Sequence, residues 1–467
     1  MRYFDFAASL IALARMTSAG PALAQNEAQS AAAAPSAPAQ VPAPAAVPPK
    51  TASPPETASP PEAAPPPEAA PAATTSTASA PNAADLSEIQ AALAADSATA
   101  SPTPSSDHAS AAPATSSGAQ SLNPDLSLIA DFAAAAFSSD HHLPGGAHDP
   151  AHNGFNLQAL ELSLAAAVDP YLRFDSHITF DLSGVDVEEA YGTTLGLPFR
   201  LQARLGQFLN RFGRLNASHP HTWNFSDQPF ALGRVFGGEG NKGLGVELSW
   251  LTPLPWYVEL VGSSMMADGE DSSRSFLGAE ERTVRGPKDL ELMAAAKQFF
   301  PLSDDWSLAW GLSGAFGPNP TGPGNRSAIY GSDLYLKFRP ITRESSLIVA
   351  LTSEWYYRRR QVPGNVLQDV SSYSELFCRF AQRWAAAARY EYGSAPFGLG
   401  GDNLVDPLDP EWTAERQRVA LALTHYPSEF SRFRLQVSRD MPGWRAASWA
   451  GFLTAELAIG AHGAHAF

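Results

Sequence analysis

The stretch YLRFDSHITFDLS, residues 171–183, decides the predicted fold. Apolar side chains dominate every second position from Leu172 to Leu182, and the positions between them carry Arg, Asp, His, Thr and Ser. A period of two is typical of an extended strand, because successive side chains point to opposite faces. A soluble sheet turns its apolar face to a core. A transmembrane barrel turns that face to lipid and the polar face to the lumen.

The composition restricts the class of protein. The chain has 467 residues and a formal net charge of -16 at pH 7, which argues against a nucleic-acid partner because such proteins present basic surfaces. A single Cys excludes an intrachain disulfide and a zinc site made of several cysteines. Beyond the first residues, no apolar run reaches the roughly 18 residues of a membrane-spanning helix. Barrel strands are short and alternating, so this test does not detect them.

Three regions differ in composition. Residues 1–24 resemble a secretory signal peptide, with a positive start, a short apolar run and the cleavage motif ALA at 22–24; a soluble helix is the alternative. Residues 25–120 are rich in Ala, Pro, Ser and Thr. We expect a disordered periplasmic linker there, because this composition buries too little apolar area to offset the entropy of ordering. It is either a tether to a periplasmic partner or a solvated tail. Residues 121–467 are the expected barrel.

Alternating segments recur after residue 121. The clearest are at 199–209, 245–251, 256–261, 329–339, 372–381, 417–424, 432–437 and 449–459. Short turns such as TPLP and HYPSE alternate with long Gly/Asn/Asp/Pro-rich connections, at 141–153, 211–242, 268–289, 317–327, 360–369 and 394–411. Short turns at one rim and long loops at the other are typical of outer-membrane barrels, and about seven short turns imply about 16 strands.

Aromatic residues gather at the predicted short-turn rim, where amphipathic rings favour the membrane interface. They are Trp250, Trp256, Tyr257, Phe299, Phe300, Trp306, Phe338, Trp384, Tyr426 and Phe430. The final aromatic residue, Phe467, resembles the assembly signal of Gram-negative barrels. We therefore expect an all-β, transmembrane antiparallel barrel in contact with the lipid of the bacterial outer membrane. The alternative is a soluble sandwich or propeller, but no repeat of about 40–50 residues indicates a propeller.

Charged residues follow the polar face of these strands, and we expect them to face the lumen because charge in lipid is costly. The candidates for the pore lining are Arg173, Asp175, Asp181, Arg200, Arg204, Asp333, Lys337, Arg379, Arg416, Arg418, Arg432 and Arg434. A barrel of about 16 strands is wide enough for an aqueous channel. The alternative is a plugged barrel in which these charges pair with one another.

The longest connection, residues 211–242, is rich in aromatic residues. A loop this long and apolar is expected to fold back into the lumen, bury Trp223, Phe225 and Phe230, and narrow the channel. Packing on the barrel mouth is the alternative.

Histidines are the candidate metal ligands, since neutral imidazole suits zinc, copper, iron or nickel. Three groups stand out: His141, His142, His148 and His152; His219 and His221; and His462 and His465. None has the spacing of a defined motif such as HExxH, and each group could instead be a polar loop in solvent. As ligands they would suit weak capture of a metal or its chelate. No resident cofactor is expected, and zinc would be a transported or loosely bound ion.

Several segments together resemble a family of Gram-negative outer-membrane barrels known as zinc-regulated TonB-dependent outer-membrane receptors. They are PYLRFDSHITF, the run from VEEAYG to SDQP at 187–229, KGLGVELSWLTPLPWYVEL and the terminal GAHGAHAF. The resemblance covers residues 122–467. It implies metal-linked uptake across the outer membrane, with His219, His221, His462 and His465 at matching positions. A barrel of about 16 strands without a plug favours a porin-like channel over an energy-coupled receptor.

The sequence therefore predicts a porin-like outer-membrane channel for small solutes, with zinc, another metal or a metal chelate as candidate cargo. The alternatives are a structural or tethering barrel without transport, and a TonB-dependent metal receptor. A homo-trimer is a further candidate, because many porins are trimers. An enzyme is not expected, since no GxSxG nucleophile elbow occurs.

Overall fold

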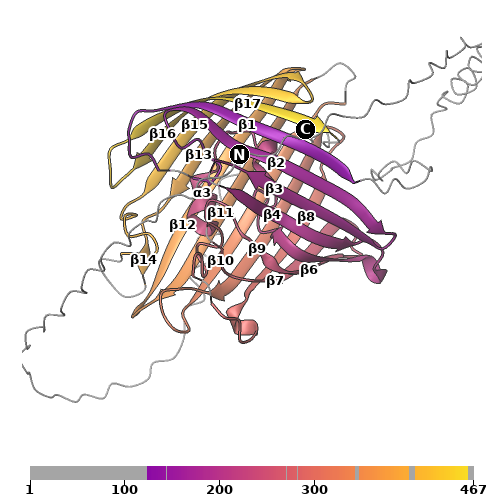
Figure 1. Cartoon of the computed structure of the whole chain (residues 1–467), viewed down its shortest axis with the longest axis vertical. Coiled ribbons are helices and arrows are strands. Elements are labelled where there is room, and N and C mark those ends of the chain that lie inside the picture. Colours follow the sequence, from indigo (N-terminus) through magenta and orange to yellow (C-terminus); the bar gives the residue numbers. More distant parts are fainter. Residues whose placement is uncertain are drawn as a thin grey trace, which may run out of the picture. The chain divides into compact units, whose positions relative to one another are not determined.

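Antiparallel strands hydrogen-bond to their sequence neighbours around a closed ring (Figure 1). The computed structural model describes residues 124–460 apart from 144, 183, 270, 281, 342–345 and 399–404. The ring closes where β1 (Asp125–Phe137) pairs with β17 (Ser448–Gly460) on one side and with β2 (Gly154–Asp169) on the other. The sheet has 17 strands, of which the two-residue β14 (Phe397–Gly398) lies beside β12, so 16 strands form the ring. The predicted all-β antiparallel barrel is confirmed.

The remaining elements follow in chain order. The strands are β3 (Leu172–Phe180), β4 (Val185–Thr194), β5 (Leu201–Leu209), β6 (Lys242–Leu251), β7 (Tyr257–Met265), β8 (Glu291–Pro301), β9 (Trp306–Pro318), β10 (Arg326–Phe338), β11 (Ile348–Val362), β12 (Asn365–Ala381), β13 (Trp384–Gly393), β15 (Arg416–Ser428) and β16 (Ser431–Pro442). The helical segments are η1 (Pro198–Arg200), η2 (Pro220–Thr222), α3 (Phe230–Phe236) and η3 (Pro287–Asp289). Among the described residues, no helix is long and apolar enough to span a membrane.

The two faces of the sheet differ in chemistry. On β15, Val419 and Leu421 point outward and are exposed, whereas Arg416 and Arg418 point inward and are buried. The same alternation runs along β16 and β17. A continuous apolar surface of this kind is stable against lipid and not against water. The protein is therefore a barrel of the bacterial outer membrane.

The rims differ as predicted, with two corrections. The predicted long connection at 317–327 is only the seven residues 319–325, because β9 and β10 extend into it. All seven predicted short turns join neighbouring strands, from β2–β3 to β15–β16. At the other rim, the longest connections are loop 1 (residues 138–153), loop 3 (residues 210–241), and residues 266–290 and 394–415. The predicted long connection at 360–369 is wrong, because β11 and β12 form a tight hairpin in which Val362 pairs with Asn365. Pro363 and Gly364, whose φ is +74°, supply the turn, since Pro followed by left-handed Gly favours type II.

The start of β5 differs from the prediction. Phe199 and Arg200 were expected on the strand, but both lie in η1 with φ near +61° and +62°. Non-glycine residues adopt this left-handed backbone mainly in turns. The strand begins at Leu201 instead, so the side chain of Arg200 is exposed at the short-turn rim.

The predicted aromatic belt is present in part. Trp250, Trp306 and Trp384 are exposed on the outer face, and Trp256 and Phe430 are exposed in the turns. Tyr257 and Phe299 pair with each other on the lumen face, where the Tyr257 hydroxyl donates to Glu259. Tyr426 also points inward and is buried. Rings exposed on the outer face near one rim match the interface anchors of membrane proteins.

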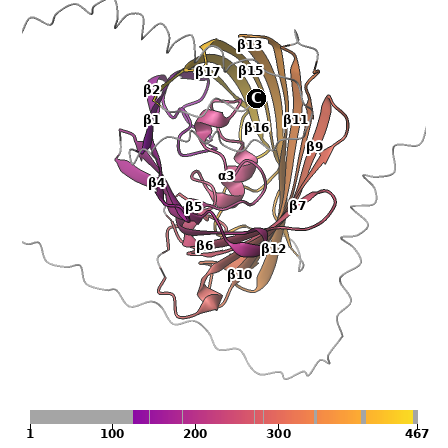
Figure 2. The ribbon, with the colours of Figure 1, turned by 90° about the vertical axis from the view of Figure 1, so that its right-hand side faces the viewer.

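Loop 3 fills the middle of the ring, where Figure 2 shows α3 inside the barrel. Phe225 and Phe230 are each 1% exposed, and Trp223 is half-buried, so the predicted inward fold is confirmed. Its Phe212 packs on the inner wall beside Gly331, where a Cβ atom would lie 2.5 Å from the ring. The glycine lets the loop approach the wall closely.

Several predictions fall on residues outside the described part of the chain. These are the signal peptide at 1–24, the linker at 25–120, the metal candidates His462 and His465, and the terminal Phe467. They stay predictions.

Candidate metal centre

A β-bulge in β4 turns two consecutive glutamates to the lumen. His177 of β3 pairs with Glu189, but the next residue, Ile178, pairs with Val187, so Glu188 is the extra residue of the bulge. Both carboxylates are consequently buried, with Glu188 5% and Glu189 6% exposed. A bulge places neighbouring side chains on one face and is often found next to functional sites.

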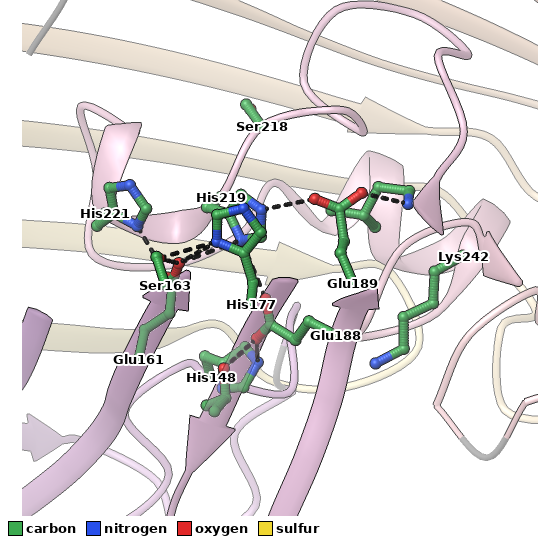
Figure 3. Close-up of polar contacts among 12 residues, drawn as sticks. His148, Glu161, Ser163, His177, Glu188, Glu189, Ser218, His219, His221 and Lys242 are labelled. Atoms are coloured by element: carbon green, nitrogen blue, oxygen red, sulfur yellow. Dashed lines mark hydrogen bonds and ion pairs between the residues drawn. The ribbon is translucent and has the colours of Figure 1, made fainter. Parts of the chain in front are cut away.

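The neighbouring strands add a third carboxylate and an imidazole. Glu161 of β2 places Oε1 2.8 Å from Nδ1 of His177 on β3. Ser163, which pairs with His177 across the two strands, has its hydroxyl 2.9 Å from the same nitrogen. These side chains lie on the lumen face of the wall (Figure 3).

Loop 3 places two imidazoles against this acidic wall. His219 lies between the two bulge glutamates, with Nδ1 3.0 Å from Glu188 Oε2 and Nε2 2.9 Å from Glu189 Oε2. Nδ1 of His221 is 2.9 Å from Glu161 Oε2. The short helix η2 fixes this pair, because Pro220 separates the two histidines and Thr222 N–H donates to the His219 carbonyl at 2.9 Å.

Loop 1 contributes a third segment. Nε2 of His148 lies 3.0 Å from Glu188 Oε1 and 3.1 Å from Oε1 of Glu239, at the end of loop 3. Neither ring nitrogen of His148 has a well-aligned hydrogen-bond partner among the described residues. The His148 nitrogen and the two glutamate oxygens lie close together without forming aligned hydrogen bonds. Such an arrangement is suited to binding one cation between the three atoms. Glu188 thus contacts His148 with one oxygen and His219 with the other (Figure 3).

The cluster has an excess of negative charge. Glu161, Glu188, Glu189 and Glu239 are largely buried, and Lys242 lies 3.2 Å from Glu239. Burial opposes protonation of His148 and His219, but the adjoining glutamates outweigh burial and hold the pKa of each imidazole well above its usual range. The site therefore favours cations, either protons on the imidazoles or a metal ion.

The donor atoms form two groups of three. One group is Glu161, His177 and His219, and the other is His148, Glu188 and Glu239; within each, the ligand atoms lie within 4.8 Å of one another. Imidazole and carboxylate donors suit zinc-class divalent ions at about 2.0–2.2 Å. Three protein donors leave a coordination position for water, as in sites that exchange their metal or act on a ligand.

The opposite wall holds loop 3 with permanent charges. The Arg418 guanidinium donates to the carbonyl of Gln228 at 2.6 Å, and that of Arg434 donates to the carbonyl of Trp223 at 2.7 Å. The carboxylate of Glu391 accepts the backbone N–H of Phe230 at 2.6 Å. Loop 3 therefore spans the lumen between an arginine-rich wall and an acidic wall.

Cavities lie on both sides of loop 3. One of about 410 Å³ is bordered by Trp223, Tyr335 and Phe377, among other residues. Another, of about 560 Å³, is bordered by Arg234 and Trp412. The loop thus divides the inner space of the barrel.

Comparison with known proteins finds a relative of this chain. An uncharacterised protein of Aquifex aeolicus is 30% identical over 385 residues, which cover 74% of this chain and 80% of that protein. The chain belongs to the family of this Aquifex protein. No model of a known protein family matches the chain.

Several solved structures are similar to this chain at low sequence identity. The DcaP channel of Acinetobacter baumannii is 13% identical, with a TM-score of 0.47, and the similarity covers 72% of this chain and 96% of that one. The anion-selective porin of Comamonas acidovorans is 10% identical, with a TM-score of 0.47 and coverage of 72% and 99%. The trimer form of Vibrio cholerae OmpT is 9% identical, with a TM-score of 0.46 and coverage of 72% and 99%. The fold of this chain is therefore established from its own strand pairings.

The cluster contains only part of the predicted histidine set. His148, His219 and His221 lie in it. His141 and His152 are not in either donor group, and His142 stacks on Phe137 with ring centroids 3.9 Å apart. The predicted first-loop group is therefore split, because of its four imidazoles only that of His148 contacts Glu188 and Glu239.

Sequence reasoning missed five residues of the cluster: Glu161, His177, Glu188, Glu189 and Glu239. Strict alternation places only one of two consecutive glutamates in the lumen, and the bulge overrides it. The sequence did contain an indication of these residues. The segments PYLRFDSHITF and VEEAYG, which carry the family resemblance, contain His177 and both bulge glutamates.

The candidates for the pore lining are distributed unequally. Asp333, Arg416, Arg418, Arg432 and Arg434 are buried on the inner wall, whereas Asp175, Arg204, Lys337 and Arg379 are half-buried there. Arg173 is exposed on the same face of β3 as His177, Asp181 lies in the β3–β4 turn, and Arg200 lies in η1. That these side chains border a conducting path stays a prediction.

Proposed function

We propose that the protein is a porin-like channel of the outer membrane for small solutes, narrowed by loop 3. The observation that carries the proposal is the division of a closed 16-strand barrel by an inward loop with a cavity on either side. A barrel of this size leaves an aqueous interior unless loops fill it. Polar and charged residues on the inner wall suit hydrated solutes.

We further propose that the His/Glu cluster binds a divalent transition metal of the zinc class. The support is the donor chemistry, since imidazole nitrogens and carboxylate oxygens converge there in two groups of three. Ions such as magnesium and calcium prefer sites made of oxygen donors alone. Zinc would be a loosely bound ion or cargo, while energy-coupled uptake of the TonB type has no support in a barrel of 16 strands.

A structural barrel without transport is the second candidate. The observation that favours it is the pairing of inner-wall arginines with loop 3: Arg418 and Arg434 donate to its backbone instead of facing open space. A barrel whose lumen is closed in this way would have a structural role in the cell envelope. Homo-trimer formation and a periplasmic partner of residues 25–120 stay predictions.

Liposome swelling separates these functions. The full-length protein, reconstituted into liposomes, is challenged with sugars of increasing size, and empty liposomes are the control. A channel narrowed by loop 3 admits small sugars rapidly and excludes larger ones. Insertion confirmed by protease protection, together with swelling no faster than in empty liposomes for every sugar, would contradict the channel and favour the structural barrel.

A further inference from the structure

The carboxylate of Glu188 joins the two donor groups. Its Oε1 is 3.0 Å from His148 Nε2 in one group, and its Oε2 is 3.0 Å from His219 Nδ1 in the other. A carboxylate whose oxygens face different ligand sets can bridge two metal ions, which in two-metal sites lie about 3.5–4 Å apart. The bulge gives Glu188 this position, because the regular ladder would have turned one of the two glutamates to lipid.

A small cavity adjoins the same side chains. It measures about 60 Å³ and is bordered by His148, Glu188, Glu239 and Lys242, and by Ser218 of loop 3. One water needs roughly 10–15 Å³ of such space, so the cavity has room for water molecules that would complete the coordination of a metal ion with three protein donors.

The donors come from segments far apart in the chain. Glu161, His177 and Glu188 belong to the barrel wall, His148 to loop 1, and His219 and Glu239 to loop 3. Ions bound here would therefore tie both loops to β2, β3 and β4.

The other side of loop 3 needs no metal. Arg389 and Arg434 hold its segment 223–227 through hydrogen bonds to backbone oxygens. The start of the loop is held as well, because the N–H of Gly213 donates to Ser313 at 3.1 Å and that of Leu215 donates to Glu354 at 2.7 Å. Loss of ions from the acidic wall would therefore loosen the segment between Leu215 and Trp223 while both of its ends stay fixed. Movement of this segment changes the width of the path beside it.

We propose that two zinc-class ions, bridged by Glu188, form a latch that holds loops 1 and 3 against the barrel wall and keeps the channel narrow. This inference rests on the proposed channel function, and its metal-binding part can be measured without conductance. Removal of the ions widens the path.

Metal content gives the first test. Full-length protein is equilibrated with zinc chloride, freed of unbound ions, and analysed by elemental mass spectrometry, with magnesium chloride in a parallel sample. We expect about two zinc ions per chain and no retained magnesium. Glu188→Gln loses the bridge and at least one ion, whereas Glu239→Gln affects one group and leaves one ion.

Glu247→Gln is the matched control. Glu247 is a buried glutamate of the inner wall that pairs with Arg204 at 2.8 Å and lies outside the cluster, so its variant keeps both ions. Circular dichroism, together with the change in electrophoretic mobility that a folded barrel shows on heating, establishes that each variant is folded. Wild-type protein that retains no zinc, or Glu188→Gln protein that retains as much as wild type, would overturn the inference.

Conductance tests the latch. In planar bilayers, a chelator added to zinc-loaded wild-type protein should raise the single-channel conductance, and zinc should restore it. The conductance of Glu188→Gln should be at the higher level from the start and should not change when chelator or zinc is added. Zinc binding with unchanged conductance would overturn the latch alone. The absence of conductance in every sample would contradict the proposed channel, while the zinc content would still decide whether the site exists.

Discussion

Arg389 of β13 binds Asp227 of loop 3 at two atoms. Its Nη1 donates to the backbone oxygen of Asp227 at 2.9 Å, and its Nη2 lies 2.5 Å from the carboxylate oxygen Oδ1. Both side chains are buried, Arg389 2% and Asp227 4% exposed. A paired guanidinium and carboxylate in such a place fix the position of a loop, because either charge alone would be costly to bury.

Arg389→Ala should loosen loop 3. The substitution leaves Asp227 with Arg418 as its remaining buried cationic partner, and breaking a buried pair costs about 3–5 kcal/mol. We expect a lower urea midpoint, faster proteolysis within loop 3 and a larger conductance. Arg439→Ala is the control, since Arg439 lies on the outer face beside Trp449. Equal protease resistance of wild type and Arg389→Ala would show that this pair does not hold the loop.

Acid should release loop 3 only at low pH. Burial alone would raise the pKa of Asp227, but Arg389 and Arg418 outweigh burial and lower that pKa. A group with a lowered pKa in the folded state stabilises fully above its ordinary pKa, near 3.9, and the stabilisation is lost as the pH falls further. Burial and the neighbouring Asp227 raise the pKa of Asp149 to about 6, so protonation of Asp149 between pH 7 and 5 adds stability.

In zinc-free protein, where the latch does not contribute, the conductance should therefore stay constant from pH 7 to 5 and rise below about pH 4. Asp227→Asn should conduct more than wild type at pH 7 and show a smaller rise in acid. A conductance of zinc-free wild-type protein that increases between pH 7 and 5 would be the opposite of this expectation.

The histidines of loop 1 should differ in their effect on zinc binding. His148 contacts two carboxylates of the cluster, whereas His141, His142 and His152 do not belong to either donor group. The triple substitution of these three by Ala should leave the zinc content unchanged, and His148→Ala should lose an ion. Elemental analysis of both variants decides this, and loss of zinc from the triple variant alone would favour a site in the loop tip.

A charged residue on the outer face should destabilise the barrel most near the middle of the membrane. Leu421 is 55% exposed on the lipid face of β15, and arginine at the midplane costs about 2–4 kcal/mol. We expect Leu421→Arg to lower the free energy of unfolding in lipid vesicles by this amount. Gln417→Arg, on the same face near the end of the strand, should cost about 0–1 kcal/mol. Equal effects of the two substitutions would argue against membrane depth as the cause.

The sequence predicts the barrel well because each strand must satisfy the same rule, apolar toward lipid and polar toward the lumen. The alternation in residues 417–424 and 432–437 therefore marks β15 and β16 correctly. A turn signal was overlooked at Pro363 and Gly364, which close the β11–β12 hairpin.

The metal cluster could be predicted only in part, because it depends on a local exception and on distant contacts. The bulge at Glu188 breaks the period of two. His148 and His219 lie in different loops, and their convergence depends on the inward course of loop 3. The two-residue periodicity of the sequence predicts neither the bulge nor the convergence of the two loops.

The most direct test of the account replaces loop 3. Its ends are neighbours, because the N–H of Asn210 donates to the carbonyl of Asn241 at 3.0 Å, so an Asn-Gly turn in place of residues 211–240 can close the β5–β6 hairpin. Single-channel conductance is measured for wild type and for this variant after both are shown to be folded. The account predicts small, discrete steps for wild type and several-fold larger steps for the variant. Equal steps, or none from either protein, would contradict a channel narrowed by loop 3.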